Sequence, residues 1–312
     1  NLAYIMRPSY QGMREAMLQL VERIPHASLV HSYPLPGTTK DGKALECLWI
    51  YYGDPEAKKV VVVEIGTHGA EAFTGMWQAR HILERIAGAV GIPRGFGVWF
   101  LCFVNPYGAE YLCRNNKDNV DDNRNHGVNF KKPPETHPAY LKFNWLINPP
   151  SISPLWRFCH ILHTLRLSMD KKQLLEIITG AGRGQWENEK WLQFGGSGPT
   201  AETLMLEAFV RTHLAHAAHV GWISLHCGLG NEGAGSIIHE NKADSPEAQR
   251  LGCYYPGTIK FEEANNVVVN TNPGGLGAVD NTIRRVLKEV NPNALFVEIT
   301  HETGTHGKPL GP

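Results

Sequence analysis

The sequence carries no net charge, because its 312 residues include 30 basic and 30 acidic side chains. It therefore gives no sign of the basic surface by which proteins bind nucleic acid or an anionic membrane, and we expect neither partner. Long hydrophobic runs are also missing, since the longest, residues 60–65 and 98–104, are far shorter than the about 20 apolar residues of a membrane-spanning helix. No signal peptide is visible.

The sequence also has no C-x-x-C pair among its cysteines. Two of the six lie inside apolar strand-like runs, where a free thiol packs as a small hydrophobic side chain. The six are Cys47, Cys102, Cys113, Cys159, Cys227 and Cys253. This scatter does not fit a disulfide framework and favours a reducing compartment, so we expect a cytoplasmic protein.

What the chain does have is a regular alternation of apolar runs and amphipathic segments. Strand-like runs occur at residues 47–52, 60–65, 98–104, 220–225, 236–239 and 294–299. Helix-like segments occur at residues 72–87, 201–218 and 281–290. This alternation predicts a three-layer α/β fold with a largely parallel sheet between helices.

Residues 131–200 depart from this alternation. Prolines recur between residues 131 and 154 and interrupt regular structure, and helix-like segments follow at 155–168 and 171–179. Two glycine-rich stretches complete the segment, which has no strand-like run. We therefore expect an insertion that forms part of a pocket wall or a lid, within a single domain that covers residues 1–312.

A candidate metal-binding pair, His68-x-x-Glu71, follows the apolar run at 60–65 directly after Gly66. Loops at strand ends often carry the chemistry of α/β proteins. An imidazole and a carboxylate three residues apart can both reach one ion, and together they suit Zn²⁺. Such a pair is also common on solvated surfaces, so a metal site requires a third ligand.

His226 is the candidate for that third ligand, because it repeats the pattern of apolar strand, histidine and glycine. If both strands belong to one parallel sheet, their carboxyl ends lie at the same edge, and His226 can meet His68 and Glu71. A short-spaced pair with one distant ligand and an open position for water is the usual layout of a catalytic zinc site. The alternative is a histidine that only closes a strand.

Polar side chains crowd residues 105–125, which follow the run at 98–104 and so belong to the same edge. The segment contains Arg114, Asn123 and Arg124. A guanidinium group offers a bidentate fork for a carboxylate, and an asparagine adds a neutral donor beside it. The segment indicates an anion clamp or an oxyanion stabiliser, although a polar surface loop held by Asx-turns has a similar composition.

Two acids, Glu298 and Glu302, occupy the last strand-like segment. Because side chains alternate along a strand, both point to the same face. A carboxylate beside zinc can deprotonate a water molecule and later protonate the leaving amine. Glu302 lies closer to the strand end and to the expected active edge, and Glu298 is the rival candidate.

Taken together, these motifs resemble those of the zinc carboxypeptidases, the carboxypeptidase A-like metallopeptidases. They are His68-x-x-Glu71, Asn-Pro-x-Gly at 105–108, Asp-x-Asn-Arg-Asn at 121–125, and His226 at a strand end. The chain is most similar to a poorly characterised bacterial branch of that family, known only as a domain of unknown function. Motifs of that branch match residues 66–75, 105–108, 114–125, 184–186, 195–200, 226–230 and 302–305. The resemblance thus covers about residues 60–305 in the same order.

The resemblance implies a mixed, mostly parallel eight-stranded sheet between helices. It also implies one Zn²⁺ per chain, bound by His68, Glu71 and His226. The other site residues carry over by position. Arg114 would polarise the scissile carbonyl, and Glu302 would act as general base and acid.

Substrate binding also carries over, since Asn123 and Arg124 would hold the terminal carboxylate of the substrate.

Three positions depart from the pattern of the branch. Cys227 stands in place of Thr and could be an adventitious metal ligand or an oxidation site. Asp122 stands in place of Leu and adds negative charge next to the clamp, and Thr303 stands in place of Phe.

The sequence assigns no tyrosine as a residue that closes over the substrate, although Tyr254 and Tyr255 are candidates. The resulting interpretation is a zinc-dependent hydrolase, a metallocarboxypeptidase that cleaves an amide bond next to a free carboxylate by zinc-activated water. Its partner would be a peptide or acyl-amino-acid substrate.

Two alternatives remain open. One is a deacylase of acyl-amino acids, similar to aspartoacylase and succinylglutamate desuccinylase, which share the H-x-x-E, N-P and N-R signatures. The other is a catalytically silent zinc- or peptide-binding module. The motifs at 118–125, 195–200 and 228–230 favour the carboxypeptidase branch, and the presence of both Glu302 and Arg124 argues against a silent module.

Overall fold

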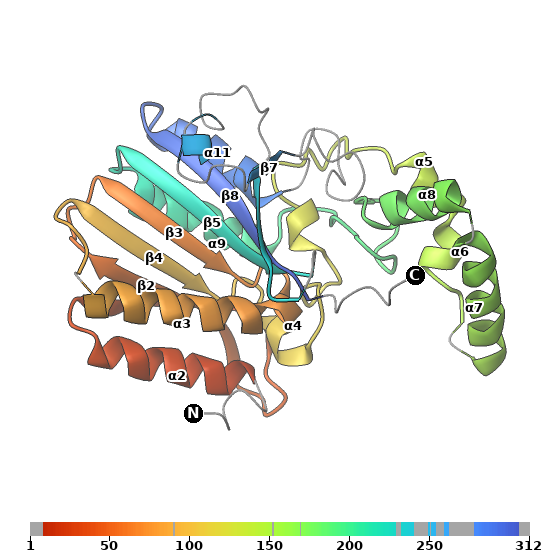
Figure 1. Cartoon of the computed structure of the whole chain (residues 1–312), viewed down its shortest axis with the longest axis horizontal. Coiled ribbons are helices and arrows are strands. Elements are labelled where there is room, and N and C mark those ends of the chain that lie inside the picture. The colour runs from red at the N-terminus through yellow and green to blue at the C-terminus, as the bar shows by residue number, and fades with distance from the viewer. Residues whose placement is uncertain are drawn as a thin grey trace.

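A mixed eight-stranded sheet forms the centre of the protein (Figure 1). The structure is a computed structural model that describes residues 9–89, 91–151, 153–168, 170–228, 232–239, 249, 251–253, 259–261 and 278–305. From edge to edge the strands are β1 (Ala27–Thr38), β2 (Ala44–Gly53), β4 (Phe96–Cys102), β3 (Lys59–Ile65), β5 (His219–Cys227), β8 (Leu295–Thr303), β6 (Gly235–His239) and β7 (Ile259–Phe261). The central strands β4, β3, β5 and β8 run parallel, whereas β1, β2 and β6 each have an antiparallel neighbour. The predicted mixed, mostly parallel sheet is confirmed.

Helices cover both faces of the sheet and produce the predicted three layers (Figure 1). The main covering helices are α2 (Tyr10–Arg23), α3 (Ala72–Ala89), α9 (Ala201–Phe209) and α11 (Val279–Val290). On one face, Met76 and Leu83 of α3 join the apolar cluster that also contains α2. On the other face, Phe209 of α9 packs in a cluster with Trp222 of β5 and side chains of α11. None of the helices in the described ranges has the length and apolar character needed to cross a membrane.

The central strands deliver their carboxyl ends to one edge of the sheet. They are rich in β-branched and aromatic residues and are buried on both faces, as expected for parallel strands between helices. In the ladder, Ile65 at the end of β3 lies between Cys102 of β4 and Leu225 of β5. The segments that follow these three strands therefore begin next to one another.

The strand-like runs and helix-like segments of the sequence all correspond to elements of the structure, but neither the short helices nor three longer or sheet-forming elements were predicted. These three are α2, β1 and β7. β1 contains Pro34 and Pro36, which argue against a strand, yet it is an edge strand, where a residue without an N–H is tolerated. α2 does carry a periodic signal, because Met13, Met17 and Leu20 share its buried face.

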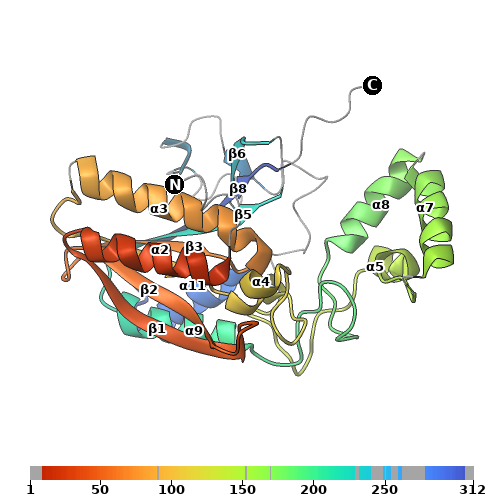
Figure 2. The ribbon, with the colours of Figure 1, turned by 90° about the horizontal axis from the view of Figure 1, so that it is seen from below.

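In its described residues, the segment 131–200 forms helices and one isolated β-bridge between Gln185 and Phe194. The helices are α5 (Pro138–Lys142), α6 (Asn144–Ile147), α7 (Pro154–Ser168) and α8 (Lys171–Ala181). They lie together at one end of the molecule, beyond the sheet, in both views (Figures 1 and 2). The end of the segment returns to the central loops, since the backbone N–H of Asp121 donates to the carbonyl of Phe194 at 2.8 Å.

Helix α7 turns apolar side chains outward. Leu155, Phe158 and Ile161 are 72%, 60% and 58% exposed. On the same helix, the ring of His163 lies against that of Trp145, with ring centroids 4.6 Å apart. The outward-facing apolar side chains of α7 are therefore exposed. This is compatible with an insertion that extends from the main fold. The single-domain organisation and the cytoplasmic location stay predictions.

Candidate metal centre

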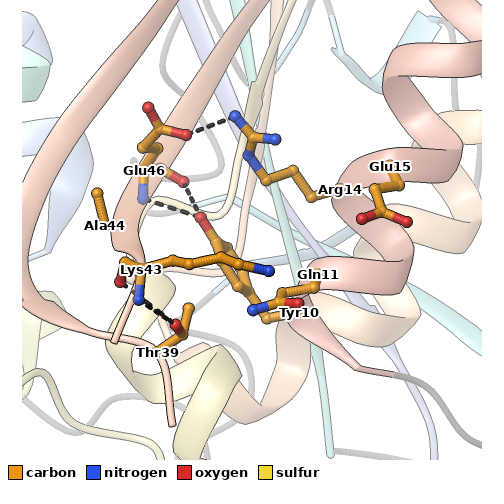
Figure 3. A pocket seen from close by; sticks show the side chains of 8 residues that line it. All are labelled: Tyr10, Gln11, Arg14, Glu15, Thr39, Lys43, Ala44 and Glu46. Carbon is orange, nitrogen blue, oxygen red and sulfur yellow. Dashed lines mark hydrogen bonds and ion pairs between the residues drawn. The ribbon is translucent and has the colours of Figure 1, made fainter. Parts of the chain in front are cut away.

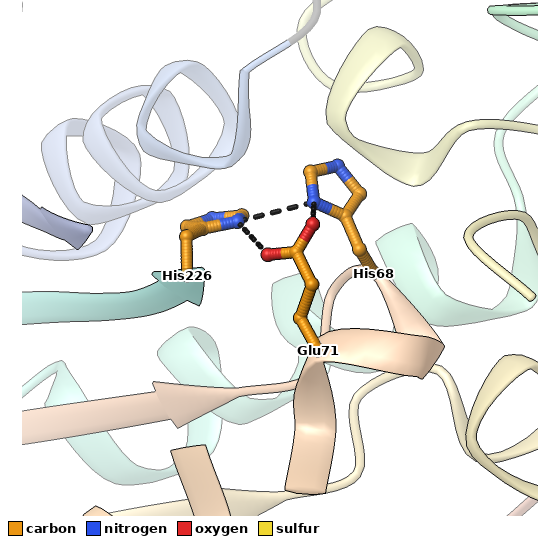
Figure 4. A group of neighbouring side chains, drawn as sticks. All are labelled: His68, Glu71 and His226. Atoms are coloured by element: carbon orange, nitrogen blue, oxygen red, sulfur yellow. Dashed lines mark hydrogen bonds and ion pairs between the residues drawn. The ribbon is translucent and has the colours of Figure 1, made fainter. Parts of the chain in front are cut away.

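Two adjacent strand ends bring the three predicted metal ligands together. β3 ends at Ile65, and His68 and the single-turn helix η1 (Gly69–Glu71) follow it. β5 runs parallel beside β3 with Leu225 opposite Ile65, so His226 lies next to the exit of β3. In Figure 4, the side chains of His68, Glu71 and His226 point toward one another from these two places.

The ligand atoms of the three residues all lie within 4.8 Å of one another. Nδ1 of His68 lies 2.8 Å from Oε1 of Glu71, and Nδ1 of His226 lies 3.0 Å from Oε2 of the same carboxylate. The two Nδ1 atoms are 3.1 Å apart. In the described part of the chain, no other group of histidine, cysteine and carboxylate ligands meets in this way.

This donor set fits a divalent cation such as Zn²⁺. Two nitrogens that each lie about 2.0–2.1 Å from one tetrahedral zinc are about 3.3 Å apart, close to the separation of the two Nδ1 atoms. Two imidazoles and one carboxylate also match the protein ligands of catalytic zinc sites. The residues present thus form a His-Glu-His group that can hold a metal ion.

The outer nitrogen of His68 faces a second carboxylate. Oδ1 of Asp121 lies 3.3 Å from Nε2 of His68, and Asp121 is fully buried. Its other oxygen accepts a hydrogen bond of 2.9 Å from Nε of Arg114. The same guanidinium lies 3.5 Å from Oε1 of Glu71, so Arg114 adjoins the metal-binding group. Carboxylates commonly orient metal-binding histidines through the nitrogen that does not bind the metal.

The charges of the group are strongly coupled. Burial acts to raise the pKa of Glu71, but the adjacent imidazoles of His68 and His226 outweigh it and hold that pKa well below its usual range. Burial acts to lower the pKa of His226, but the hydrogen bond and the charge of Glu71 prevail and raise it to about 9. In the absence of a metal, the Glu71 carboxylate is therefore ionised at neutral pH, and His226 is a positively charged imidazolium.

The η1 turn is fixed by very close packing against α4 (Pro106–Tyr111). An added Cβ at Gly69 would lie 2.1 Å from the carbonyl carbon of Gly108, a distance at which backbone atoms must move. Backbone N–H groups of Gly69 and Ala70 donate to the carbonyls of Arg114 and Cys113. Only glycine allows this approach, which sets the positions of the flanking ligands.

Asn123 and Arg124 were predicted to hold a substrate carboxylate, but their side chains have different surroundings. Asn123 lines a pocket together with His226 and Thr300, and its Oδ1 accepts a hydrogen bond of 3.2 Å from the N–H of Val279. Arg124 is only 6% exposed, and its guanidinium donates to the carbonyls of Asn123 and Gly182. Arg124 thus ties the end of the 131–200 segment to the central loop.

Asp122 points away from the clamp. It is fully buried, and its Oδ1 accepts hydrogen bonds from Thr200 Oγ1 at 2.9 Å and Asn116 Nδ2 at 3.2 Å. The same amide donates to Glu202, so the two acids share one donor. Burial, with the neighbouring Glu202 charge, raises the pKa of Asp122 well above its usual range. The acid expected to add charge beside the clamp instead joins the loop to the start of α9.

The register of β5 and β8 separates the two candidate acids. Glu302 lies opposite His226, whereas Glu298 lies opposite Trp222, four residues earlier. Glu298 is buried and lies 3.9 Å from the guanidinium of Arg284. Glu302 therefore lies beside His226 at the strand end, whereas Glu298 lines the pocket that also contains Asn123 and His226.

Cys227 touches the group through its backbone, because its N–H donates to Oε2 of Glu71 at 3.0 Å. Burial raises the pKa of its thiol, which disfavours the thiolate that metal binding or oxidation requires. Its sulfur is not part of the group of converging ligand atoms. Tyr254 and Tyr255 lie outside the described residues.

The sequence prediction did not include two buried polar residues beneath the site, Glu64 of β3 and Ser224 of β5. Oγ of Ser224 lies 3.1 Å from Nε2 of His226 and donates to the carboxylate of Glu64. The available signal was an acid and a serine inside otherwise apolar strands, where a polar group must have a partner.

A second pocket lies between α2 and the start of β2 (Figure 3). The hydroxyl of Tyr10 donates to the carbonyl of Glu46 at 3.0 Å and accepts from its N–H at 2.8 Å. Arg14 pairs with the Glu46 carboxylate at 2.5 Å, and Lys43 pairs with Asp41 at 3.0 Å. None of the predicted site residues lines this pocket.

Comparison with solved structures shows which fold this is. Carboxypeptidase A from Helicoverpa armigera matches with a TM-score of 0.55 at 13% identity, covering 97% of this chain and 66% of that chain. Thrombin activatable fibrinolysis inhibitor matches with a TM-score of 0.52 at 13% identity, covering 94% and 65%. The chain thus spans just under two thirds of the length of these proteins, and the likeness shows a shared fold.

Among curated proteins, no sequence matches this chain. A family model does match, and it extends over all of the residues that carry the motifs described above. The model, described as "Protein of unknown function (DUF2817)", matches residues 7–307, and the chain therefore belongs to this family.

Proposed function

We propose that this protein is a zinc-dependent metallocarboxypeptidase, which cleaves an amide bond next to a free carboxylate. The observation that carries the proposal is the convergence of His68, Glu71 and His226 at the carboxyl edge of a parallel sheet. The ligand set matches that of a catalytic zinc site, and the fold is shared with carboxypeptidase A from Helicoverpa armigera.

The three ligands would hold one Zn²⁺ through two imidazole Nδ1 atoms and the Glu71 carboxylate. A zinc ion bound there supplies Lewis acidity, which lowers the pKa of water and polarises a carbonyl group. Asp121 would keep His68 oriented by its contact with Nε2. These residues bind and orient, and they transfer no proton to the substrate.

Proton transfer would belong to Glu302, which lies opposite His226 at the rim of the sheet. Its carboxylate would take a proton from the attacking water and deliver it to the leaving amine. Arg114 would donate hydrogen bonds to the carbonyl oxygen as negative charge develops on it. Asn123, in the pocket beside His226, would bind the terminal carboxylate, with Arg124 behind it.

The proposal is tested by metal analysis and by hydrolysis of matched substrates. The purified chain should contain about one zinc per molecule and cleave acyl-dipeptides that end in a free carboxylate, but not the same compounds ending in an amide. Removal of zinc with a chelator should stop cleavage, and added zinc should restore it.

Three results would contradict this function. Cleavage that persists after removal of the metal would exclude zinc catalysis. Cleavage of N-acyl-amino acids but of no dipeptide would identify a deacylase. Stoichiometric zinc with hydrolysis of neither substrate class would identify a silent binding module.

A further inference from the structure

We infer that Glu64 and Ser224 are positioning residues for His226, which form a relay from a buried carboxylate through a hydroxyl to the imidazole. The relay selects the form of His226 that presents its Nδ1 lone pair to the metal. This inference deepens the proposed function and rests on the metal site within it, but not on the reaction.

The relay is built into the sheet directly beneath the site. Glu64 of β3 and Ser224 of β5 are partners in the parallel ladder. Ser224 precedes His226 by two residues, so the two side chains lie on the same face of the strand. Glu64 is 1% exposed and Ser224 is 7% exposed. Both side chains are therefore largely shielded from bulk water.

The direction of the hydrogen bonds follows from the number of protons available. The Glu64 carboxylate accepts from two hydroxyls, those of Thr67 and Ser224. A serine hydroxyl has one proton, and here Ser224 gives it to Glu64. The oxygen of Ser224 can then only accept from Nε2 of His226, which lies 3.1 Å away. His226 must therefore carry a proton on Nε2.

A proton fixed on Nε2 decides what Nδ1 can do. In a neutral imidazole, one nitrogen carries the proton and the other carries the lone pair. With Nε2 protonated, the lone pair is on Nδ1, which faces Glu71 and His68. The hydroxyl thus holds both the tautomer and the ring orientation that metal binding requires.

Both histidines of the site are consequently oriented by a buried carboxylate, one directly and the other through a hydroxyl group. His68 faces the carboxylate of Asp121 directly, with 3.3 Å between Nε2 and Oδ1. His226 reaches the carboxylate of Glu64 through the hydroxyl of Ser224. Loss of a partner of this kind typically lowers metal affinity by about 10- to 100-fold.

Zinc affinity of the full chain, measured by competition with a chromophoric chelator, tests the relay. Ser224→Ala removes the hydroxyl and should weaken Zn²⁺ binding by about 10- to 100-fold. Glu64→Gln should act in the same direction, because the amide can donate to Ser224 and turn its proton toward Nε2. Thr67→Val is the matched control, since Thr67 touches the same carboxylate but not His226. It should change zinc affinity by less than about threefold, whatever it does to stability.

Two spectroscopic readouts separate a positioning role from a merely structural one. The visible absorption spectrum of the Co²⁺-substituted protein should change in Ser224→Ala and stay like that of the wild type in Thr67→Val. In the zinc-loaded wild type, long-range ¹⁵N–¹H spectra should show His226 protonated at Nε2. This measurement requires no variant to fold.

Unchanged zinc affinity in both Ser224→Ala and Glu64→Gln would overturn the relay. An equal loss in Thr67→Val, or a proton on Nδ1 in the wild type, would do the same. Failure of the proposed hydrolase gives a different pattern, because absent hydrolysis with a lower zinc affinity in Ser224→Ala still supports the relay.

Discussion

His226 and Glu302 lie opposite each other at the ends of two adjacent parallel strands, β5 and β8. The other acid of β8, Glu298, is four residues farther from that end, about 13 Å at the rise of a parallel strand. The negative charge of Glu302 contributes to the raised pKa of His226 and to that of the Cys227 thiol. Because the charge of Glu302 acts on both His226 and Cys227, its carboxylate lies near the metal-binding residues, as a general base must.

Glu302→Gln should therefore abolish turnover while zinc remains bound. Loss of a general base lowers kcat by about 10²- to 10⁴-fold. Glu298→Gln removes the same charge from the same strand and serves as the matched control, in which measurable turnover should persist. Steady-state kinetics with zinc analysis of each variant checks the pair, and the assignment fails if Glu298→Gln is the inactive one.

Arg114→Lys should keep the positive charge but lose the planar fork that joins Asp121 and Glu71. The Nε of Arg114 donates to Asp121 at 2.9 Å, which leaves its terminal nitrogens toward the site. We expect kcat/KM to fall by about 10²- to 10³-fold, as for loss of an oxyanion donor. Arg80→Lys, at an exposed ion pair with Glu84, is the control and should be neutral. Equal activity of the two variants would remove Arg114 from the mechanism.

Local sequence signals predicted much of this fold, but pairing between distant strands determines which side chains meet at the site. The β-branched run of β3 and the histidine after it were sufficient to place His68 at a strand end. The sequence favoured Glu302 over Glu298 by its place near the strand end, but only the register of β5 against β8 shows that Glu302 lies opposite His226. For the same reason the partnership of Glu64 with Ser224, 160 residues apart, was invisible in the sequence.

Gly69→Ala should damage the metal site without touching a ligand. The added Cβ would lie 2.1 Å from the backbone of Gly108, so η1 and α4 must separate and move His68 and Glu71. We expect a destabilisation of about 2–4 kcal/mol and a zinc affinity at least about 10-fold lower. The matched control is Gly88→Ala in α3, where no atom lies within 4 Å of the added group.

Gly88→Ala should instead stabilise the protein by about 0.5–1 kcal/mol, because alanine has the higher helix propensity. Denaturant unfolding and chelator competition measure both effects. Equal stability and equal zinc affinity in the two variants would show that the close approach of Gly69 and Gly108 is not required.

Asp122→Asn should stabilise the protein at neutral and higher pH. Burial and the nearby Glu202 raise the pKa of Asp122, so the folded state binds more protons than the unfolded state above about pH 4. Its contribution to stability is therefore favourable at low pH and falls as the pH rises toward the folded-state pKa. The variant removes this loss, and we expect a gain of about 1–3 kcal/mol at pH 8 that shrinks at pH 5.

Asp118→Asn is the control for this pH effect, because Asp118 lies in the same loop with its side chain 66% exposed. Its effect should stay within about 0.5 kcal/mol at both pH values. Urea unfolding of both variants across this range is the measurement. If the gain in stability from Asp122→Asn instead grew toward pH 5, the pKa of Asp122 would not be raised in the folded state, and the account of Asp122 and Glu202 as a buried acid pair would be wrong.

Zinc binding should release a proton and therefore strengthen as the pH rises. Glu71 has a lowered pKa and is already ionised at neutral pH, so it contributes no proton. His226 has a pKa raised to about 9 by Glu71 and is protonated below that value, yet it must bind metal as the neutral imidazole. The apparent affinity should then rise about tenfold per pH unit between pH 6.5 and 8.5 and level off near pH 9. Calorimetry in buffers of different ionisation enthalpy should detect this proton at pH 7.5, and binding with no pH dependence would show that His226 is neutral before zinc arrives.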